Sequence, residues 1–189
     1  MRFDLTSFNL LSIPGLAYVP NYLDPILHDR VLRIVDSLPW QSELKRRVQH
    51  YGYTYDYRRR TVERIGALPD WAAEIAIRLA ERGLGRDVPD QLIVNEYQPG
   101  QGIAAHVDMP LFADMIVSIS LGSACVMEFT NGESSIKEQL RLEPRSALVL
   151  SGEARSGWRH SIPARKRDKW HGTVSPRTRR VSLTFRKVL

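Results

Sequence analysis

Apolar residues recur every three or four positions in two stretches of the N-terminal half of the chain, 25–38 and 69–83. This spacing places them on one face of a helix. Asp24 can cap the first stretch, and Pro25 suits its first turn. In the second stretch, Gly83 is suited to end the helix. The pattern therefore predicts two amphipathic helices, each with its apolar face in the core.

Beyond residue 90 the pattern becomes typical of strands. Six short apolar runs are separated by clusters of Gly, Pro, Asn and Ser, and they are residues 91–98, 115–122, 125–130, 139–144, 146–152 and 180–187. Two helices followed by at least six strands indicate an α+β domain with a jelly-roll or β-sandwich body. Residues 164–180 are rich in charge and are predicted to form a mobile, linker-like segment.

The length of 189 residues suits one hydrophobic core, so we expect a single domain over residues 1–189. No apolar run is long enough for a membrane helix, and the N-terminal stretch lacks the order of a secretory signal. Cys125 is the only cysteine, which excludes an internal disulfide and a thiolate zinc cluster. We therefore expect a cytoplasmic monomer without a membrane partner.

The net charge of +6 is unevenly distributed. Residues 155–187 hold eight Arg and three Lys against one acid, a net +10, and residues 45–64 carry +5. The rest of the chain therefore carries −9. Two basic segments on an acidic remainder predict a polyanionic partner, of which nucleic acid is the first candidate.

The sequence offers one pair of neighbouring metal ligands. In an extended segment, His106 and Asp108 point to the same side, where a nitrogen and a carboxylate oxygen can meet on one divalent ion. A third ligand would be His160 or His171, and His160 is favoured because it follows a strong strand. Two histidines and one carboxylate, with open positions, are the ligand set of non-haem Fe(II) oxygenases.

The last predicted strand carries two arginines on one face. Arg180, Ser182 and Arg186 lie on one face of this strand, and its apolar residues lie on the opposite face. Inward-facing arginines need anions, and a dicarboxylate cosubstrate together with a metal-bound Asp would supply them. On residues 91–98, Asn95 and Tyr97 likewise share a face and can donate hydrogen bonds to such a ligand.

These motifs, in this order, resemble the AlkB-like Fe(II)- and 2-oxoglutarate-dependent dioxygenases. The matching residues are N-x-Y at Asn95 and Tyr97, H-x-D at His106 and Asp108, the distal His160, and the pair Arg180 and Arg186. The resemblance implies a double-stranded β-helix over approximately residues 91–187, with N-terminal helices and a nucleotide-recognition lid. It also implies Fe(II), 2-oxoglutarate and O2 as cofactor and cosubstrates.

The resemblance assigns roles to these residues. His106, Asp108 and His160 would hold iron, and Arg180 would bind the distal carboxylate of 2-oxoglutarate with help from Asn95 and Tyr97. Arg186 would lie near Asp108 and the chelating end of the cosubstrate. Ser182 stands where some members of the family have Asn and would also line the cosubstrate site.

The segment at approximately 44–64 resembles the lid of the family, in which R-x-x-x-Y-G recurs, here from Arg47 to Gly52. It combines arginines for phosphates with tyrosines that can stack on an exposed base. The predicted substrate-binding residues are Arg46, Arg47, Tyr51, Tyr53, Tyr55, Tyr57, Arg58, Arg59 and Arg60. Lys166, Arg167 and Lys169 are expected to add phosphate contacts near the third ligand. The alternative is a strand whose tyrosines simply pack on a helix.

The predicted reaction is oxidative demethylation of an alkylated base in DNA or RNA, with release of formaldehyde, succinate and CO2. Bacterial DNA-repair members often carry a second acid two positions after the ligand Asp, where this chain has Pro110, and residues 106–129 are also similar to animal oxygenases that hydroxylate modified wobble uridines in tRNA. Two alternatives therefore stay open. One is an iron and 2-oxoglutarate enzyme that acts on modified tRNA, a protein side chain or a lipid; the other is a metal-free jelly-roll module that binds nucleic acid.

Overall fold

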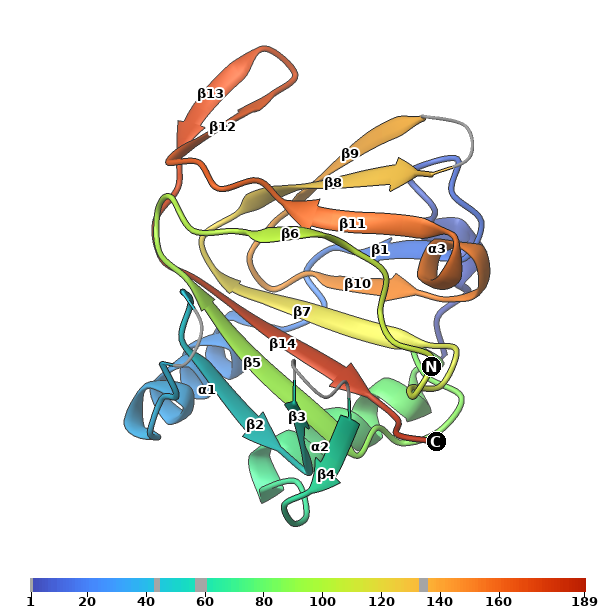
Figure 1. Cartoon of the computed structure of the whole chain (residues 1–189), viewed down its shortest axis with the longest axis vertical. Coiled ribbons are helices and arrows are strands. Elements are labelled where there is room, and N and C mark those ends of the chain that lie inside the picture. Colours follow the sequence, from blue (N-terminus) through green and yellow to red (C-terminus); the bar gives the residue numbers. More distant parts are fainter. Residues whose placement is uncertain (1, 43–44, 57–60, 133–135) are drawn as a thin grey trace.

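The computed structural model describes residues 2–42, 45–56, 61–132 and 136–189 (Figure 1). The helices are the 3-10 turn η1 (Leu5–Phe8), α1 (Pro25–Ser37), α2 (Asp70–Glu81) and the short α3 (Gly152–Ser156). Asp24 caps α1 as predicted, because its carboxylate accepts a 2.8 Å hydrogen bond from the amide of Leu27. Gly83 follows α2 with φ of 80°, the left-handed conformation that commonly ends a helix.

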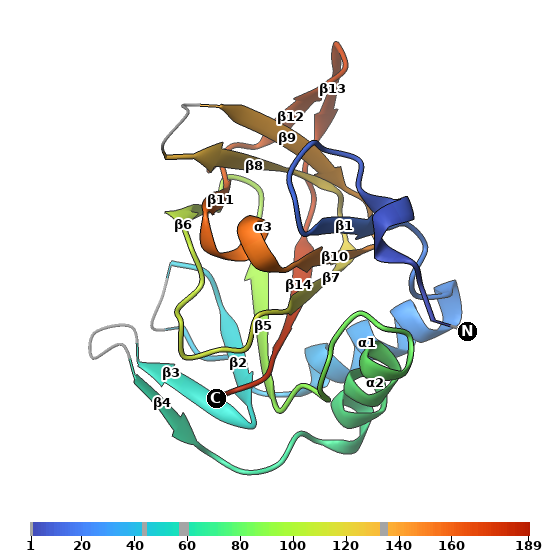
Figure 2. The same ribbon diagram turned by 90° about the vertical axis from the view of Figure 1, so that its right-hand side faces the viewer.

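Two antiparallel sheets face each other and form the body of the molecule (Figures 1 and 2). The larger sheet has the order β1 (Leu16–Val19), β10 (Ala147–Leu150), β7 (Ile116–Gly122), β14 (Arg180–Arg186), β5 (Gln91–Tyr97) and β2 (Val48–Tyr51). The smaller sheet has the order β6 (Ile103–His106), β11 (Trp158–Ile162), β8 (Cys125–Asn131) and β9 (Lys137–Leu142). Two hairpins stand apart, β3 (Tyr53–Asp56) with β4 (Thr61–Arg64), and β12 (Arg167–Trp170) with β13 (Thr173–Pro176). This arrangement is the predicted jelly roll.

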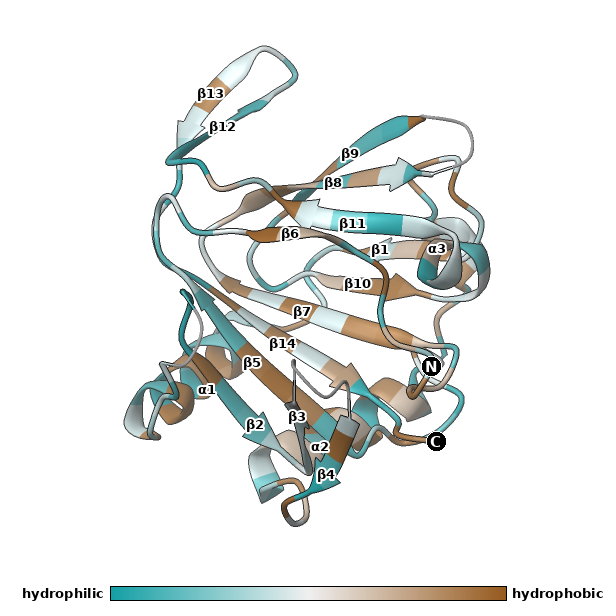
Figure 3. Ribbon diagram, in the orientation of Figure 1, coloured by the Kyte–Doolittle hydropathy of each residue, from teal (hydrophilic) through white to brown (hydrophobic). Residues whose placement is uncertain are grey.

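The larger sheet is buried on both faces. Its outer face, with Val181, Leu183 and Phe185 of β14, packs against α1 and α2 in one apolar cluster. Its inner face meets the smaller sheet in a second cluster that includes Met127 and Leu148. Strict alternation along β14 therefore turns Arg180, Ser182, Thr184 and Arg186 toward the space between the sheets. Figure 3 shows the same alternation as brown and pale or teal bands along the strands.

The prediction of a mobile linker over 164–180 was wrong. That segment holds the β12–β13 hairpin, whose strands pair from Arg167 with Pro176 to Trp170 with Thr173. The strands were missed because both are short, β12 is highly charged, and neither shows an apolar alternation. None of the described helices is long and apolar enough to cross a membrane.

Candidate active site

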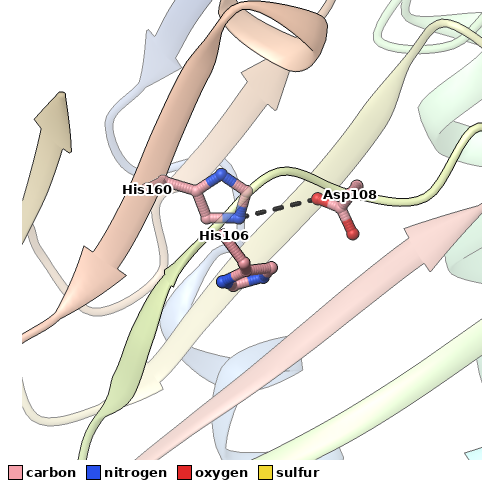
Figure 4. Close-up of side chains that lie close together, drawn as sticks. All are labelled: His106, Asp108 and His160. Atoms are coloured by element: carbon pink, nitrogen blue, oxygen red, sulfur yellow. Dashed lines mark ion pairs between the residues drawn. The ribbon is translucent and has the colours of Figure 1, made fainter. Parts of the chain in front are cut away.

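Three possible metal ligands meet on the inner face of the smaller sheet (Figure 4). His106 ends β6 and lies directly opposite His160 in the antiparallel β6–β11 pair, and Asp108 follows two residues later. Their ligand atoms all lie within 4.8 Å of one another. The closest ion pair joins His160 Nε2 to Asp108 Oδ2 at 3.5 Å. The register between two strands therefore brings together residues that are 54 positions apart in the sequence.

The surrounding contacts orient each ligand. The Nδ1 atom of His106 lies 2.9 Å from the carbonyl of Ala104, which leaves its Nε2 for a metal. Arg186 donates from Nη2 and Nε to Oδ1 of Asp108, at 2.7 and 3.1 Å, so that Oδ2 is left facing His160. Two imidazole nitrogens and one carboxylate oxygen fit Fe(II) and leave coordination positions for a cosubstrate and O2.

Electrostatics keep Asp108 and His160 in their metal-binding protonation states. Burial raises the pKa of Asp108, but Arg186 and the two histidines outweigh it, and the resulting pKa is about 2. Burial lowers the pKa of His160 to about 4, against the opposing effect of Asp108. At neutral pH the site therefore offers an ionised carboxylate and a neutral imidazole, which are the forms that bind metals.

A cavity runs from the triad to Arg180, which is 2% exposed. One guanidinium nitrogen, Nη2, donates to Ser120 at 2.9 Å, while Nε and Nη1 have no hydrogen-bond partner in the described part of the chain. A buried cation with two unused donors is unfavourable alone and suits a carboxylate ligand. The cavity also has Asn95, Tyr97 and Ser182 in its wall, so the described structure fits a dicarboxylate.

A larger pocket of about 730 Å³ adjoins the triad and shares His106, Asp108 and Arg186 with the cavity. Its apolar wall includes Tyr55 and Phe112, whose ring centroids lie 6.5 Å apart. Arg46 and Arg159 also line it. Arg46 donates to Asn95 Oδ1 at 2.8 Å, and Arg159 donates to the carbonyl of Ala105 at 2.7 Å. The pocket thus joins the metal-binding triad to two aromatic rings, tilted by 53° to each other, and to two cationic side chains.

Comparison with known proteins decides the family. The profile of the 2OG-Fe(II) oxygenase superfamily matches residues 16–186. The chain is 41% identical to an Arabidopsis thaliana protein named alkylated DNA repair protein ALKBH8 homolog, over 94% of this chain and 59% of that protein. This chain belongs to the AlkB-like 2OG-Fe(II) oxygenases. It is therefore a dioxygenase that uses Fe(II), 2-oxoglutarate and O2.

Two further matches complete the comparison. The Xenopus tropicalis protein named tRNA (carboxymethyluridine(34)-5-O)-methyltransferase alkbh8 is 36% identical over 93% of this chain and 32% of its own length. The AlkB-like chain thus spans about three-fifths of the plant relative and about a third of the frog relative. The solved structure of OsALKBH1 shares the fold, with a TM-score of 0.71 at 18% identity over 94% of this chain and 98% of that one.

The residues predicted for the substrate are divided between the two faces of β5 and β2. Arg46 and Tyr55 line the pocket of this oxygenase. Arg47 lies on the opposite face and donates two hydrogen bonds to Glu96, at 2.7 and 2.8 Å. Tyr51 also lies on that face, where its ring meets Trp71 edge-on at 5.7 Å. For Tyr51 the structure matches the alternative of a tyrosine that packs on a helix.

None of the other predicted contacts is among the described residues that line the pocket. Tyr53 is in β3, and its carbonyl accepts a hydrogen bond from Gln91. Tyr57, Arg58, Arg59 and Arg60 lie outside the described residues. His171, the alternative third ligand, is in the turn of the β12–β13 hairpin and not in the triad.

Arg159 and Phe112 are among the pocket residues that had not been predicted. Arg159 directly precedes the ligand His160, so the alternation of β11 turns the two residues to opposite sides of the strand. Phe112 follows Asp108 by four residues in an irregular segment and carries no periodic signal. Its ring lies 4.9 Å from the guanidinium of Arg186, a contact that sequence spacing does not reveal.

Proposed function

We propose that this AlkB-like dioxygenase hydroxylates a carbon atom of an alkyl substituent on a nucleobase in DNA or RNA. The observation that carries the proposal is the 730 Å³ pocket, which places aromatic and arginine side chains beside the triad. Iron with 2-oxoglutarate and O2 supplies the chemistry: one C–H bond becomes C–OH while 2-oxoglutarate is converted to succinate and CO2. The chain binds and orients the reactants.

In this proposal His106, Asp108 and His160 hold the iron. Arg180 binds the distal carboxylate of 2-oxoglutarate through its two unused N–H donors, with Asn95, Tyr97 and Ser182 in the same wall. Arg186 holds Oδ1 of Asp108 so that the other oxygen faces the metal. Apart from Asp108, which lies in the segment after β6, these residues are on strands, where alternation fixes the side to which each side chain points.

The substrate base enters the larger pocket in this proposal. Tyr55 and Phe112 provide aromatic surface for it, and Arg46 and Arg159 contact the phosphates beside it. The base must leave its stack, which costs a few kcal/mol and is easiest in a single strand or a damaged pair. The predicted lid, approximately residues 44–64, is proposed to cover the base.

The bond that carries the alkyl group decides the product. Hydroxylation of an N-methyl group gives N–CH2OH, which breaks its C–N bond to leave N–H and formaldehyde. Hydroxylation of a carbon-linked substituent gives a stable alcohol. Dealkylation, the first candidate, is supported by the name of the Arabidopsis relative. The second candidate is hydroxylation of a modified uridine in tRNA, and the name of the frog relative, a methyltransferase of carboxymethyluridine in tRNA, supports this substrate.

One experiment distinguishes the two candidates. Purified protein with Fe(II) and 2-oxoglutarate is given single-stranded DNA and RNA that carry 1-methyladenine or 3-methylcytosine, and tRNA that carries carboxymethyl-type wobble uridines. Formaldehyde with a mass loss of one methylene group supports dealkylation, and a gain of one oxygen atom supports tRNA hydroxylation. His160→Ala is the control, because it removes one ligand of the triad.

Absence of both products, from a protein that still converts 2-oxoglutarate to succinate, would contradict the nucleic-acid function. That result would favour a protein side chain or a lipid as substrate. The cytoplasmic location and the monomeric state stay predictions.

A further inference from the structure

The β12–β13 hairpin projects from one end of the smaller sheet, on the side of the molecule away from α1 and α2 (Figures 1 and 2). None of its residues lines the triad cavity or the larger pocket. Lys166, Arg167 and Lys169 were expected to contact phosphates around the base, and the structure places Arg167 and Lys169 on this hairpin instead. Its role must therefore be sought outside the pocket.

A buried carboxylate fixes the base of the hairpin. Asp168, 5% exposed, accepts hydrogen bonds from Arg177 at 2.6 and 2.7 Å, from Arg165 at 2.7 Å and from the amide of Val126 in β8 at 3.1 Å. Charge-assisted hydrogen bonds of this kind are among the strongest in proteins. The hairpin is thus held rigidly on the edge of the body, and a rigid element loses little conformational entropy when it binds a partner.

One face of the hairpin is cationic and unpaired. Arg167 lies opposite Pro176 and Lys169 lies opposite Val174, so these four exposed residues share a face. Neither Arg167 nor Lys169 makes a hydrogen bond or ion pair with another described residue. Asp168, the one acid of the two strands, points to the other face and is already paired.

This face differs from most of the basic segment 155–187. Several arginines there are used inside the molecule: Arg155 donates to three carbonyls, Arg165 and Arg177 bind Asp168, Arg179 binds Asp36 and Glu96, and Arg186 binds Asp108. The excess of positive charge read from the sequence is therefore largely internal. Arg167 and Lys169 are among the charges left for a partner.

The tip of the hairpin adds aromatic surface. His171 and Gly172 have φ of 45° and 82°, which is the two-residue turn that matches the twist of antiparallel strands. His171 is exposed, and the Trp170 ring lies edge-on to it with centroids 4.5 Å apart. A non-glycine residue in the left-handed region is uncommon, although His tolerates it better than most. The turn holds an imidazole and an indole side by side at the tip.

We propose that the exposed face of the β12–β13 hairpin, with Arg167, Lys169 and His171, binds the phosphate backbone of the nucleic acid outside the catalytic pocket. The inference rests on the proposed nucleic-acid function and extends it to a folded substrate. Charge complementarity selects the partner, because two lysine or arginine side chains without acids match phosphodiester groups. A two-stranded ribbon can also enter the major groove of a B-form duplex. The hairpin therefore adds affinity for a folded stem. A short single strand bound in the pocket would not extend as far as the hairpin and would not gain this affinity.

The test compares two double variants of equal charge change. Arg167→Ala with Lys169→Ala alters the hairpin, and Arg33→Ala with Arg86→Ala is the matched control. Arg33 and Arg86 are exposed and lie in or beside the helices on the far side of the larger sheet. Their side chains make no hydrogen bond or ion pair with a described residue. The probes are an anticodon stem-loop as RNA, the same stem-loop as DNA, and the single-stranded loop alone. Fluorescence anisotropy gives Kd over a range of salt concentrations.

For the hairpin variant we expect the Kd for the stem-loops to rise about tenfold at low salt, and the salt slope to become shallower by about 1.4 to 1.8, the value for two phosphate contacts. Binding of the loop alone should match the control. Rescue by Arg167→Lys with Lys169→Arg would support a charge contact. RNA and DNA stems that respond equally identify the phosphates, and a response confined to RNA identifies the ribose-phosphate backbone.

Equal stem-loop Kd and slope for the hairpin and control variants would overturn the hairpin proposal while leaving the proposed function intact. If the unaltered protein binds none of the three probes but still forms succinate, the proposed nucleic-acid function fails, and the hairpin proposal fails with it.

Discussion

Arg180 combines deep burial with two donors that no described side chain or carbonyl satisfies. Replacement by Ala removes a charge-assisted contact worth about 1.5 to 3 kcal/mol, so we expect the concentration of 2-oxoglutarate needed for half-maximal binding to rise about tenfold to a hundredfold. Anaerobic titration of the Fe(II)-loaded protein measures it. Arg159→Ala, which alters only the larger pocket, should bind 2-oxoglutarate like the unaltered protein; equal affinities for both variants would place the anchor elsewhere.

His160 and His171 are the two histidines that sequence spacing offered as the third ligand. Only His160 lies with His106 and Asp108, and His171 is at the hairpin tip. We expect His160→Ala to abolish stable Fe(II) binding and succinate formation, and His171→Ala to retain both. Metal content after anaerobic loading and gel filtration provides the measurement. Loss of iron in the His171 variant but not in the His160 variant would reverse the assignment.

At the scale of elements, one buried carboxylate ties the root of the predicted lid to the sheet and to α1. Glu96 of β5 is 2% exposed and accepts from Arg47 and Arg179, and Arg179 also binds Asp36 of α1. The hydrogen bond from Arg47 and the contribution of Arg179 outweigh burial and lower the pKa of Glu96 from 4.5 to about 2. Arg47 therefore acts as a structural link and not as a free phosphate ligand.

This shift predicts a pH dependence of stability. Because the pKa of Glu96 is lower in the folded state, its carboxylate stabilises the fold above pH 4.5, and the contribution is lost as the pH falls toward about 2. Urea unfolding measures the free energy of unfolding at several pH values between 4.5 and about 2. As the pH is lowered over this range, that free energy should fall more steeply for the unaltered protein than for Glu96→Gln. If the free energy of unfolding had the same dependence on pH in both proteins, Glu96 would not be the source of the pH dependence.

Ligand binding should raise the thermal stability of the whole molecule, because the site joins β6, the segment after it, β11 and β14. A ligand that binds only the folded state adds about 2.7 kcal/mol to the free energy of unfolding at a hundred times its Kd. We expect Fe(II) with 2-oxoglutarate, under anaerobic conditions, to raise the Tm, and EDTA to reverse the rise. His160→Ala should show no rise; a rise of equal size in that variant would mean that the ligands bind elsewhere.

The local sequence determined the two longer helices, α1 and α2, the six apolar strands and the two faces of each strand, because these depend on periods of two or about 3.6 residues within one segment. It also determined that Arg180 and Arg186 share a face with Ser182, and that a His and an Asp two residues apart can meet on one metal. It did not predict η1 or α3. Short or polar strands such as β2, β12 and β13 carry too few apolar positions for such a pattern.

Only the tertiary structure decided which charges are used inside the molecule and which face outward. The registers of β6 with β11 and of β14 with β5 place His160 opposite His106 and Arg180 opposite Tyr97, over separations that no local pattern contains. Asp168 binds Arg165 and Arg177, and Glu96 binds Arg47, so net charge alone could not locate a nucleic-acid surface. Pairing between distant side chains depends on packing, because a buried charge must find a partner wherever the fold brings one.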